Sequence, residues 1–260
     1  MIKLILRLRF YLFILLMTIG YSSEAQTKWK TWGNAGVDLS LSKKTALGFN
    51  HLRSYNLSNS FSNNFNQTSA TIDHDFTKHL TGKAGVTLSQ YPSSGTTTQR
   101  YYLRGTNKVR LGGVVNWFNG LQAELHSGNE TRFRDRIIYI TRFAPRHRLD
   151  FLHLSPSVSY WLYYNLGGNP IQYYDKSGLP SVKQTPDGLH RGRLIINLNS
   201  KINKNLSVAI FYLNQTEFNL GNNKGLNVVN PSTGKITRPF DSYQVAGLTF
   251  TFNFNLYSKD

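Results

Sequence analysis

The sequence predicts an all-β protein, namely a transmembrane antiparallel β-barrel of about 12 strands (roughly 10 to 14) that follows a cleaved signal peptide. Three observations support this fold class: an N-terminal export signal, long segments of alternating apolar and polar residues, and an unusual composition. The chain contains 16 Phe, 15 Tyr and 4 Trp, yet its mean hydropathy is negative. An aromatic-rich but polar chain is typical of a barrel with a polar interior and an apolar outer wall.

The N-terminal segment has the features of a secretory signal peptide. Basic residues precede an apolar run over 10–20, and the small residues Ser23 and Ala25 frame a cleavage site. We therefore divide the chain into a signal peptide at 1–25 and an outer-membrane β-barrel domain at 26–260. After this signal no apolar run reaches the roughly 18 residues of a membrane-spanning helix, so strands are expected to cross the bilayer. The expected location is the outer membrane of a Gram-negative bacterium.

The strands are predicted from stretches in which apolar and polar residues alternate, because a period of two places successive side chains on opposite faces. These stretches recur along the whole chain after the signal peptide. In chain order, the predicted strands cover 35–41, the region of Leu47 and Phe49, 67–76, 80–91, 101–111, 121–126, 131–143, a segment ending near Tyr164, 191–202, 206–217 and 243–257.

This pattern amounts to about eleven strands, whereas bacterial single-chain barrels almost always contain an even number. An even number requires either an extra short strand at 26–33 or the absence of a turn in 112–120. Over 137–140 the residues at both odd and even positions are apolar, so alternation assigns no face there, and we expect a bulge or a layer of side chains that plugs the barrel.

The strongest alternation lies in the last strand, at 243–257. Apolar residues occupy every second position of 246–256, and polar or small residues occupy the others. The pattern runs for about 10 residues, the length that a tilted strand needs to cross a bilayer. Gly247, Phe250 and Phe252 also resemble the C-terminal signal that the barrel assembly machinery recognises. The alternative is an edge strand of a soluble sandwich, but so apolar an edge would invite aggregation.

Short turns alternate with long loops along the predicted barrel. The turns at 42–44, 77–79 and 203–205 are short and carry Lys, whereas the longest loops cover 165–190 and 218–241. In outer-membrane barrels the short turns face the periplasm and the long loops face the outside. We expect the same orientation here.

Basic residues dominate the chain, which has 30 Lys and Arg, 13 Asp and Glu, and a formal net charge of +17. A Lys or Arg on the lipid face at mid-membrane costs about 2–4 kcal/mol, so most of them are expected in the lumen or at the rims. By parity, the basic residues expected in the lumen are Lys83, Arg104, Lys108, Arg110, Arg132, Arg134, Arg136, Arg191, Arg193 and Lys201. The acidic residues expected there are Asp38, Asp73, Asp75 and Glu124.

Two interpretations fit such a basic lumen. In the first, salt bridges fill a closed barrel with a structural or adhesive role. In the second, the barrel is a narrow, porin-like channel or a binding barrel for small anionic solutes. The expected partners are small anionic solutes, the assembly machinery and outer-membrane lipids, including lipopolysaccharide. A strongly basic chain can also indicate nucleic-acid binding, but export makes nucleic acid an unexpected partner.

Catalysis is not expected, although one motif suggests an alternative. Residues 124–129 resemble the His-Ser-Asn-Gly stretch of outer-membrane phospholipases, so the alternative is a lipid hydrolase of the phospholipase or lipid A deacylase type. His126 and Ser127 are adjacent, however, and would point to opposite faces of a strand. The triplet at 73–75 resembles a metal site, but the same period turns His74 away from its neighbours. We expect no metal and no cofactor.

The chain resembles the exported β-barrel family known as domain of unknown function 2490. The resemblance rests on the strand that contains Trp32, the turn at 42–44 and the Arg-x-Arg-x-Arg pattern at 132–136. It covers roughly residues 29–257 and implies an outer-membrane barrel. It implies no activity, because the role of that family is unassigned.

Overall fold

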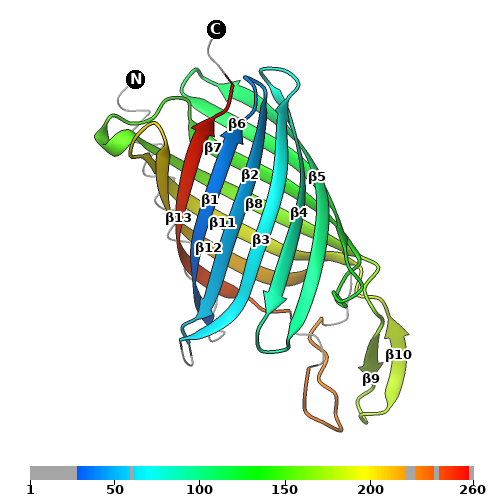
Figure 1. The fold of residues 1–260 in the computed structure, drawn as a ribbon. Helices are drawn as coiled ribbons and strands as arrows, with labels where there is room; N and C mark the ends of the chain where they lie inside the picture. The colour runs from blue at the N-terminus through cyan, green and yellow to red at the C-terminus, as the bar shows by residue number, and fades with distance from the viewer. Residues whose placement is uncertain (1–27, 59–60, 221–225, 237–239, 258–260) are drawn as a thin grey trace, which may run out of the picture.

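The computed structural model describes residues 28–58, 61–220, 226–236 and 240–257. The predicted signal peptide at 1–25 and its cleavage site lie outside these residues. Within them, eleven strands close into one barrel and two short strands form a separate hairpin (Figure 1). The predicted fold class, an all-β barrel within the expected range of strand numbers, is confirmed. No helix in the described part of the chain is long and apolar enough to span a membrane.

The barrel strands are 11 to 16 residues long, so each is long enough to cross a bilayer, which takes roughly 9–11 residues of a tilted strand. They are β1 (Lys28–Ser40), β2 (Thr45–Asn56), β3 (Ser62–Asp75), β4 (Leu80–Tyr91), β5 (Thr96–Leu111), β6 (Val115–His126), β7 (Asp135–Pro145), β8 (Leu154–Leu166), β11 (Gly188–Lys201), β12 (Leu206–Leu220) and β13 (Tyr243–Asn255). The separate hairpin consists of β9 (Ile171–Tyr174) and β10 (Pro180–Gln184), and a 3-10 turn, η1 (Phe151–His153), precedes β8.

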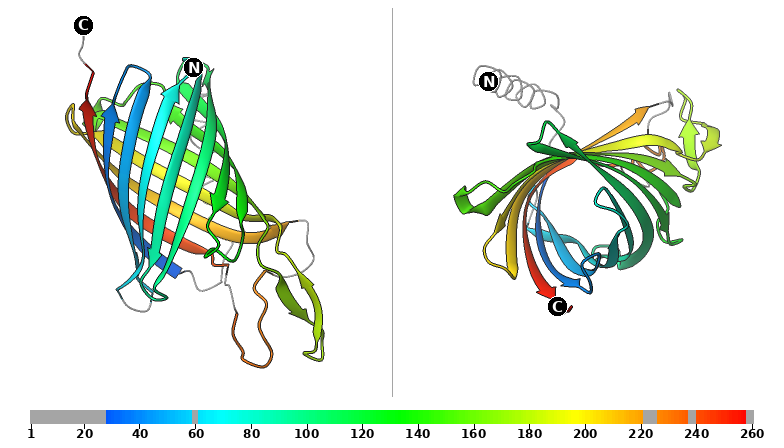
Figure 2. Two further views of the ribbon diagram at one scale, coloured as in Figure 1. Left: turned by 45° about the vertical axis from the view of Figure 1, so that its right-hand side comes forward. Right: turned by 90° about the horizontal axis from the view of Figure 1, so that it is seen from above.

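The barrel closes between its first and last strands, which run parallel to each other. Their register is unbroken from Lys28 beside Tyr243 to Ser40 beside Asn255, and the two strands lie side by side in blue and red in Figure 2. The other ten neighbouring pairs are antiparallel, as expected. A parallel closure goes with an odd number of strands, so the adjustment to an even number is wrong.

The structure contains neither a separate strand at 26–33 nor an uninterrupted strand through 112–120 in its described residues, so the number of strands does not become even. The described part of 26–33 already belongs to β1, which begins at Lys28. A turn over 112–114 separates β5 from β6. Gly112 and Gly113 have φ angles of 55° and 75° there, a backbone conformation that glycine adopts without the steric cost of a Cβ atom.

The two ends of the barrel differ in the length of their connections. We call one the turn end, where short connections such as 41–44, 76–79 and 202–205 join neighbouring strands. We call the other the loop end, where the longest connections, 167–187 and 221–242, leave the barrel. Figure 1 shows the turn end above and the loop end with the β9–β10 hairpin below. β1 starts at the loop end, and β13 finishes at the turn end.

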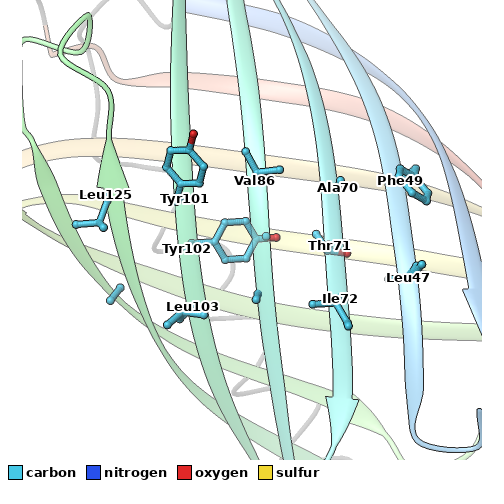
Figure 3. A pocket seen from close by; sticks show the side chains of 13 residues that line it. Leu47, Phe49, Ala70, Thr71, Ile72, Val86, Tyr101, Tyr102, Leu103 and Leu125 are labelled. Carbon is cyan, nitrogen blue, oxygen red and sulfur yellow. The ribbon is translucent and has the colours of Figure 1, made fainter. Parts of the chain in front are cut away.

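The outward faces of the barrel strands are apolar. Leu103 is 68% exposed and Ile210 62%, and Phe250 and Phe252 of β13 also point outward with more than a third of their surface exposed. Figure 3 shows part of this wall, where the small side chain of Ala70 lies among larger ones and leaves a hollow of about 760 Å³. Such a wall suits contact with lipid chains.

The inward faces are polar except for two apolar clusters. In one, the buried side chains of Ile138, Ile140 and Tyr163 pack together with Trp161. Ile137 and Tyr139 point outward, whereas Ile138 and Ile140 point into the lumen. The segment 137–140 is therefore apolar on both its outer and its luminal face. The register between β6 and β7 is regular, so the segment forms an apolar layer and not a bulge.

The second luminal cluster lies beside the parallel closure. Leu213 of β12 packs against Tyr243 and Val245 of β13, and the partly buried residues Trp32, Ile195 and Phe211 complete it. The strands that carry these clusters also carry inward polar residues, namely Arg136 on β7, Arg193 on β11 and Gln215 on β12. Charged and apolar side chains of the lumen therefore lie directly beside one another.

Candidate functional site

The loop-end half of the lumen encloses a cavity of about 770 Å³, which we call the luminal cavity. Its lining extends from Ser93 and Glu130 in the loops to Ile138 and Leu213 of the apolar clusters. The basic residues that line it are Lys30, Arg100, Arg104, Arg132, Arg136, Arg191 and Arg193. The acidic residues that line it are Glu124, Glu130 and Asp241.

Part of this positive charge is neutralised around the buried carboxylate of Glu124. Arg136 donates from Nε to Glu124 Oε2 at 2.7 Å, and Gln122 donates to Oε1. His126 Nε2 lies 3.2 Å from Oε2, and Arg100 Nε lies 3.7 Å from Oε1. Cross-strand pairing of β5, β6 and β7 places these groups in adjacent rows. Because only 2% of Glu124 is exposed, this carboxylate relies on protein donors and not on water.

A second ion pair neutralises Arg191. Its Nε donates to Oε1 of Glu217 at 2.5 Å, and both side chains are less than a tenth exposed. Gln215 donates to the same oxygen at 2.8 Å. Glu217 lies directly opposite Arg191 in the β11–β12 ladder, which makes this pair a cross-strand contact.

Arg193, in contrast, is held by neutral groups. Its Nε donates to Gln215 Oε1 at 2.7 Å, and its two terminal nitrogens donate to the hydroxyls of Tyr163 and Tyr243 at 3.2 Å each. No carboxylate of the described residues forms an ion pair with it. Its side chain is thus positioned without loss of its net charge.

Arg104 and Lys30 are also held by neutral groups. Arg104 donates to Gln122 Oε1 at 2.6 Å, and its guanidinium lies 5.1 Å from the ring centre of Trp161. Lys30 Nζ lies 4.1 Å from the ring centre of Tyr243. Among the described residues neither side chain forms an ion pair. Cation–π contacts of this kind stabilise a cation but leave its charge available to an anion.

The remaining predicted luminal charges lie nearer the turn end. Lys83 forms an ion pair with Asp73 at 3.1 Å, and Asp75 accepts a hydrogen bond from Thr81 at 2.7 Å. Asp38 lies opposite Gly48 in the β1–β2 ladder. Lys108 and Arg110 share the inward parity of Arg104 in β5, and Lys201 shares that of Arg193 in β11.

The expected common face of Arg132, Arg134 and Arg136 is wrong, because β7 begins only at Asp135. Arg136 alone is an inward strand residue. Arg132 reaches the luminal cavity from the preceding loop, whereas the Arg134 side chain is 75% exposed and pairs with Asp135 at 3.1 Å. Alternation predicts a face only within a strand, so it does not apply to this loop.

Arg132 and Glu130 form a pair at the mouth of the cavity. Arg132 Nη2 lies 2.8 Å from Glu130 Oε2, and its Nε donates to Oε1 at 3.0 Å. Burial disfavours the charged carboxylate, but the hydrogen bonds and the positive charge of Arg132 outweigh it and lower the pKa of Glu130. This pair therefore adds little net charge to the cavity.

The sequence analysis missed several residues of the cavity because it predicted β1 and β5 to start several residues later than they do. β5 starts at Thr96, so Arg100 continues the inward parity of Arg104. β1 starts at Lys28, so Lys30 continues the inward parity of Asp38. Extending each alternation backwards would have found both. Glu130 and Asp241 lie in loops, where no pattern indicates the direction of a side chain.

The motif that suggested a hydrolase does not bring its nucleophile and base together. The Oγ of Ser127 accepts a hydrogen bond from the backbone N–H of Gln99 at 3.0 Å. The ring of His126 bonds to Glu124 and packs edge-on against Phe133 with ring centres 4.8 Å apart. A serine nucleophile needs its base within hydrogen-bond reach. Here each group is engaged elsewhere.

The triplet at 73–75 is also divided between the two faces. Asp73 faces the lumen and pairs with Lys83, whereas His74 is hydrogen-bonded to Thr45 at 2.9 Å on the outer wall. Within the described ranges, no three His, Asp or Glu side chains gather in a way that could hold a metal ion.

No protein-family model matches this sequence, and no curated protein matches it either. The resemblance to domain of unknown function 2490 therefore stays a prediction.

Proposed function

We propose that the protein is an outer-membrane β-barrel whose luminal cavity binds small anionic solutes that enter from the loop end. The observation that carries this proposal is that the hydrogen-bond partners of Arg193 are all neutral groups. A partly buried arginine whose hydrogen-bond partners are all neutral is a preformed site for a carboxylate or a phosphate, because its guanidinium is already held in one orientation. Arg104 and Lys30 add two further charges without a carboxylate partner in the same cavity.

The apolar outer wall supports the proposed location. Rows of exposed Leu, Ile and Phe side chains on strands of this length would aggregate in water but match the apolar band of a membrane barrel. In that setting the loop end faces outward, and its basic residues meet the anionic groups of lipopolysaccharide. Gly247, Phe250 and Phe252 belong to the segment through which the assembly machinery would recognise the chain.

Binding is favoured over free permeation and over catalysis. The apolar clusters at Ile138 and Leu213 form part of the cavity wall, and so apolar a lining suits a binding barrel better than a wide aqueous pore. Ser127 and His126 point to different partners, which disfavours a lipid hydrolase. Phospholipid or lipid A hydrolysis by the purified barrel, abolished in His126→Ala, would favour the hydrolase instead.

Calorimetric titration of the detergent-solubilised barrel with sodium acetate and sodium phosphate tests the proposal. We expect both anions to bind and Arg193→Gln to weaken their affinity by about tenfold or more, since a charge-assisted hydrogen bond contributes about 1.5–3 kcal/mol. Arg134→Gln is the matched control, because Arg134 is exposed outside the cavity and should leave the affinity unchanged. Equal affinities in the wild type and Arg193→Gln would contradict the proposal.

A further inference from the structure

Two of the three cavity cations that lack a carboxylate partner, Lys30 and Arg193, meet at one aromatic ring. The Nζ of Lys30 lies over the face of Tyr243, 4.1 Å from the ring centre, and the Tyr243 hydroxyl accepts a hydrogen bond from Arg193 at 3.2 Å. The parallel closure brings Lys30 of β1 beside Tyr243 of β13, and the antiparallel pairs β11–β12 and β12–β13 place Arg193 of β11 in the same row as this ring. An anion between them would contact two positive groups at once.

A continuous aromatic surface extends from this ring along the cavity. Trp32 contacts Tyr243 with ring centres 6.4 Å apart and contacts Phe65 edge-on at 5.8 Å. Phe65 in turn lies 6.0 Å from Tyr91. All four rings line the luminal cavity. This surface suits a ligand with a flat apolar part, because aromatic rings pair favourably with one another over such distances.

Several polar side chains of the cavity wall are already hydrogen-bonded within the wall. Gln67 donates to Ser89 at 3.1 Å, and Arg100 donates to Thr87 at 3.4 Å. A sugar would need free donors and acceptors around several hydroxyls. The aromatic surface beside two cations makes fewer polar demands on its ligand.

We propose that the luminal cavity selects small organic anions that carry an aromatic ring. The anionic group contacts Lys30 and Arg193, and the ring lies against Trp32 and Phe65. This inference rests on the proposed anion binding and adds the class of ligand to it. Both halves of the ligand are required, because the cations attract any anion whereas the rings discriminate among them.

The test compares four probes by calorimetric titration of the full-length mature barrel in detergent: phenylacetate, acetate, 2-phenylethanol and glucose 1-phosphate. We expect phenylacetate to bind about tenfold more tightly than acetate, which lacks the ring, and than 2-phenylethanol, which lacks the charge. Equal affinities of acetate and phenylacetate, both lost in Arg193→Gln, would overturn the aromatic selectivity and leave anion binding intact. Tighter binding of glucose 1-phosphate would also overturn it. If no anion binds, both proposals fail.

Variants separate the two halves of the site. Lys30→Met should reduce phenylacetate affinity about tenfold, whereas Lys43→Met is the matched control, because Lys43 lies in the exposed turn 41–44 at the turn end, away from the cavity. Trp32→Leu should reduce the affinity for phenylacetate but not for acetate. Phe65→Leu tests the same wall independently if Trp32→Leu does not fold, as judged by the heat-dependent gel shift. A parallel loss of both probes in the ring variants would contradict the inference.

Discussion

The ring of Phe211 lies directly over Gly247, so close that a Cβ atom added to Gly247 would stand 2.1 Å from the ring. The two residues face each other across the β12–β13 ladder on the luminal side. This contact places Phe211 within the apolar cluster beside the barrel closure. Gly247 is thus needed for packing inside the barrel, whatever its part in assembly.

Gly247→Ala should therefore destabilise the folded barrel. Overpacking of this kind costs about 1–3 kcal/mol, and we expect the midpoint of urea unfolding in detergent to fall accordingly. Gly33→Ala is the matched control, because no atom lies within 4 Å of a Cβ at Gly33. Adding Phe211→Leu to Gly247→Ala should restore part of the loss, and the absence of any rescue would argue against this contact.

Breaking the buried cluster at Glu124 should be costly. Arg136→Met leaves the carboxylate of Glu124 without its main donor, and breaking a buried pair typically costs about 3–5 kcal/mol. The exposed pair of Arg134 and Asp135 serves as control, because Arg134→Met should change the stability by less than about 1 kcal/mol. Urea unfolding of both variants measures the difference, and similar losses would show that Glu124 is solvated in the folded state.

The stability of the cavity mouth should depend on pH through Glu130. The folded-state pKa of this carboxyl lies below its ordinary value of 4.5, because the hydrogen bonds and charge of Arg132 outweigh the effect of burial. The stabilisation is complete above pH 4.5 and is lost as the pH falls through the lowered pKa. Glu130→Gln should therefore flatten the decline of stability in this acidic window. Thermal unfolding between neutral and acidic pH measures it, and an unchanged slope would contradict the prediction.

The parallel closure can be tested by cross-linking, since the chain has no Cys of its own. Thr31 pairs with Ala246, and Leu39 pairs with Phe254. Cysteines at either pair should form a disulfide upon mild oxidation, because paired positions lie within disulfide distance. The exchanged combinations, Thr31 with Phe254 and Leu39 with Ala246, should stay reduced. The opposite outcome would indicate an antiparallel closure and a different number of strands.

The sequence by itself determined the two faces of the barrel wall. Alternation is a local property of an extended chain, so it correctly placed Phe250 and Phe252 outside and Arg104, Arg136 and Arg193 inside. The same pattern also yielded the number of strands directly. Only the adjustment to an even number led away from it, because that rule describes how other barrels close.

The tertiary structure alone decided which charges remain available to a ligand. Arg193 meets the hydroxyls of Tyr163 and Tyr243, which are 30 and 50 residues away in the chain. Arg191, two positions earlier on the same face, meets Glu217 instead. These partners depend on the register between strands and on the parallel contact of β1 with β13, which arise from the closure of the whole sheet. Local alternation reports the face of a side chain, but it carries no information about the residue that lies across from it.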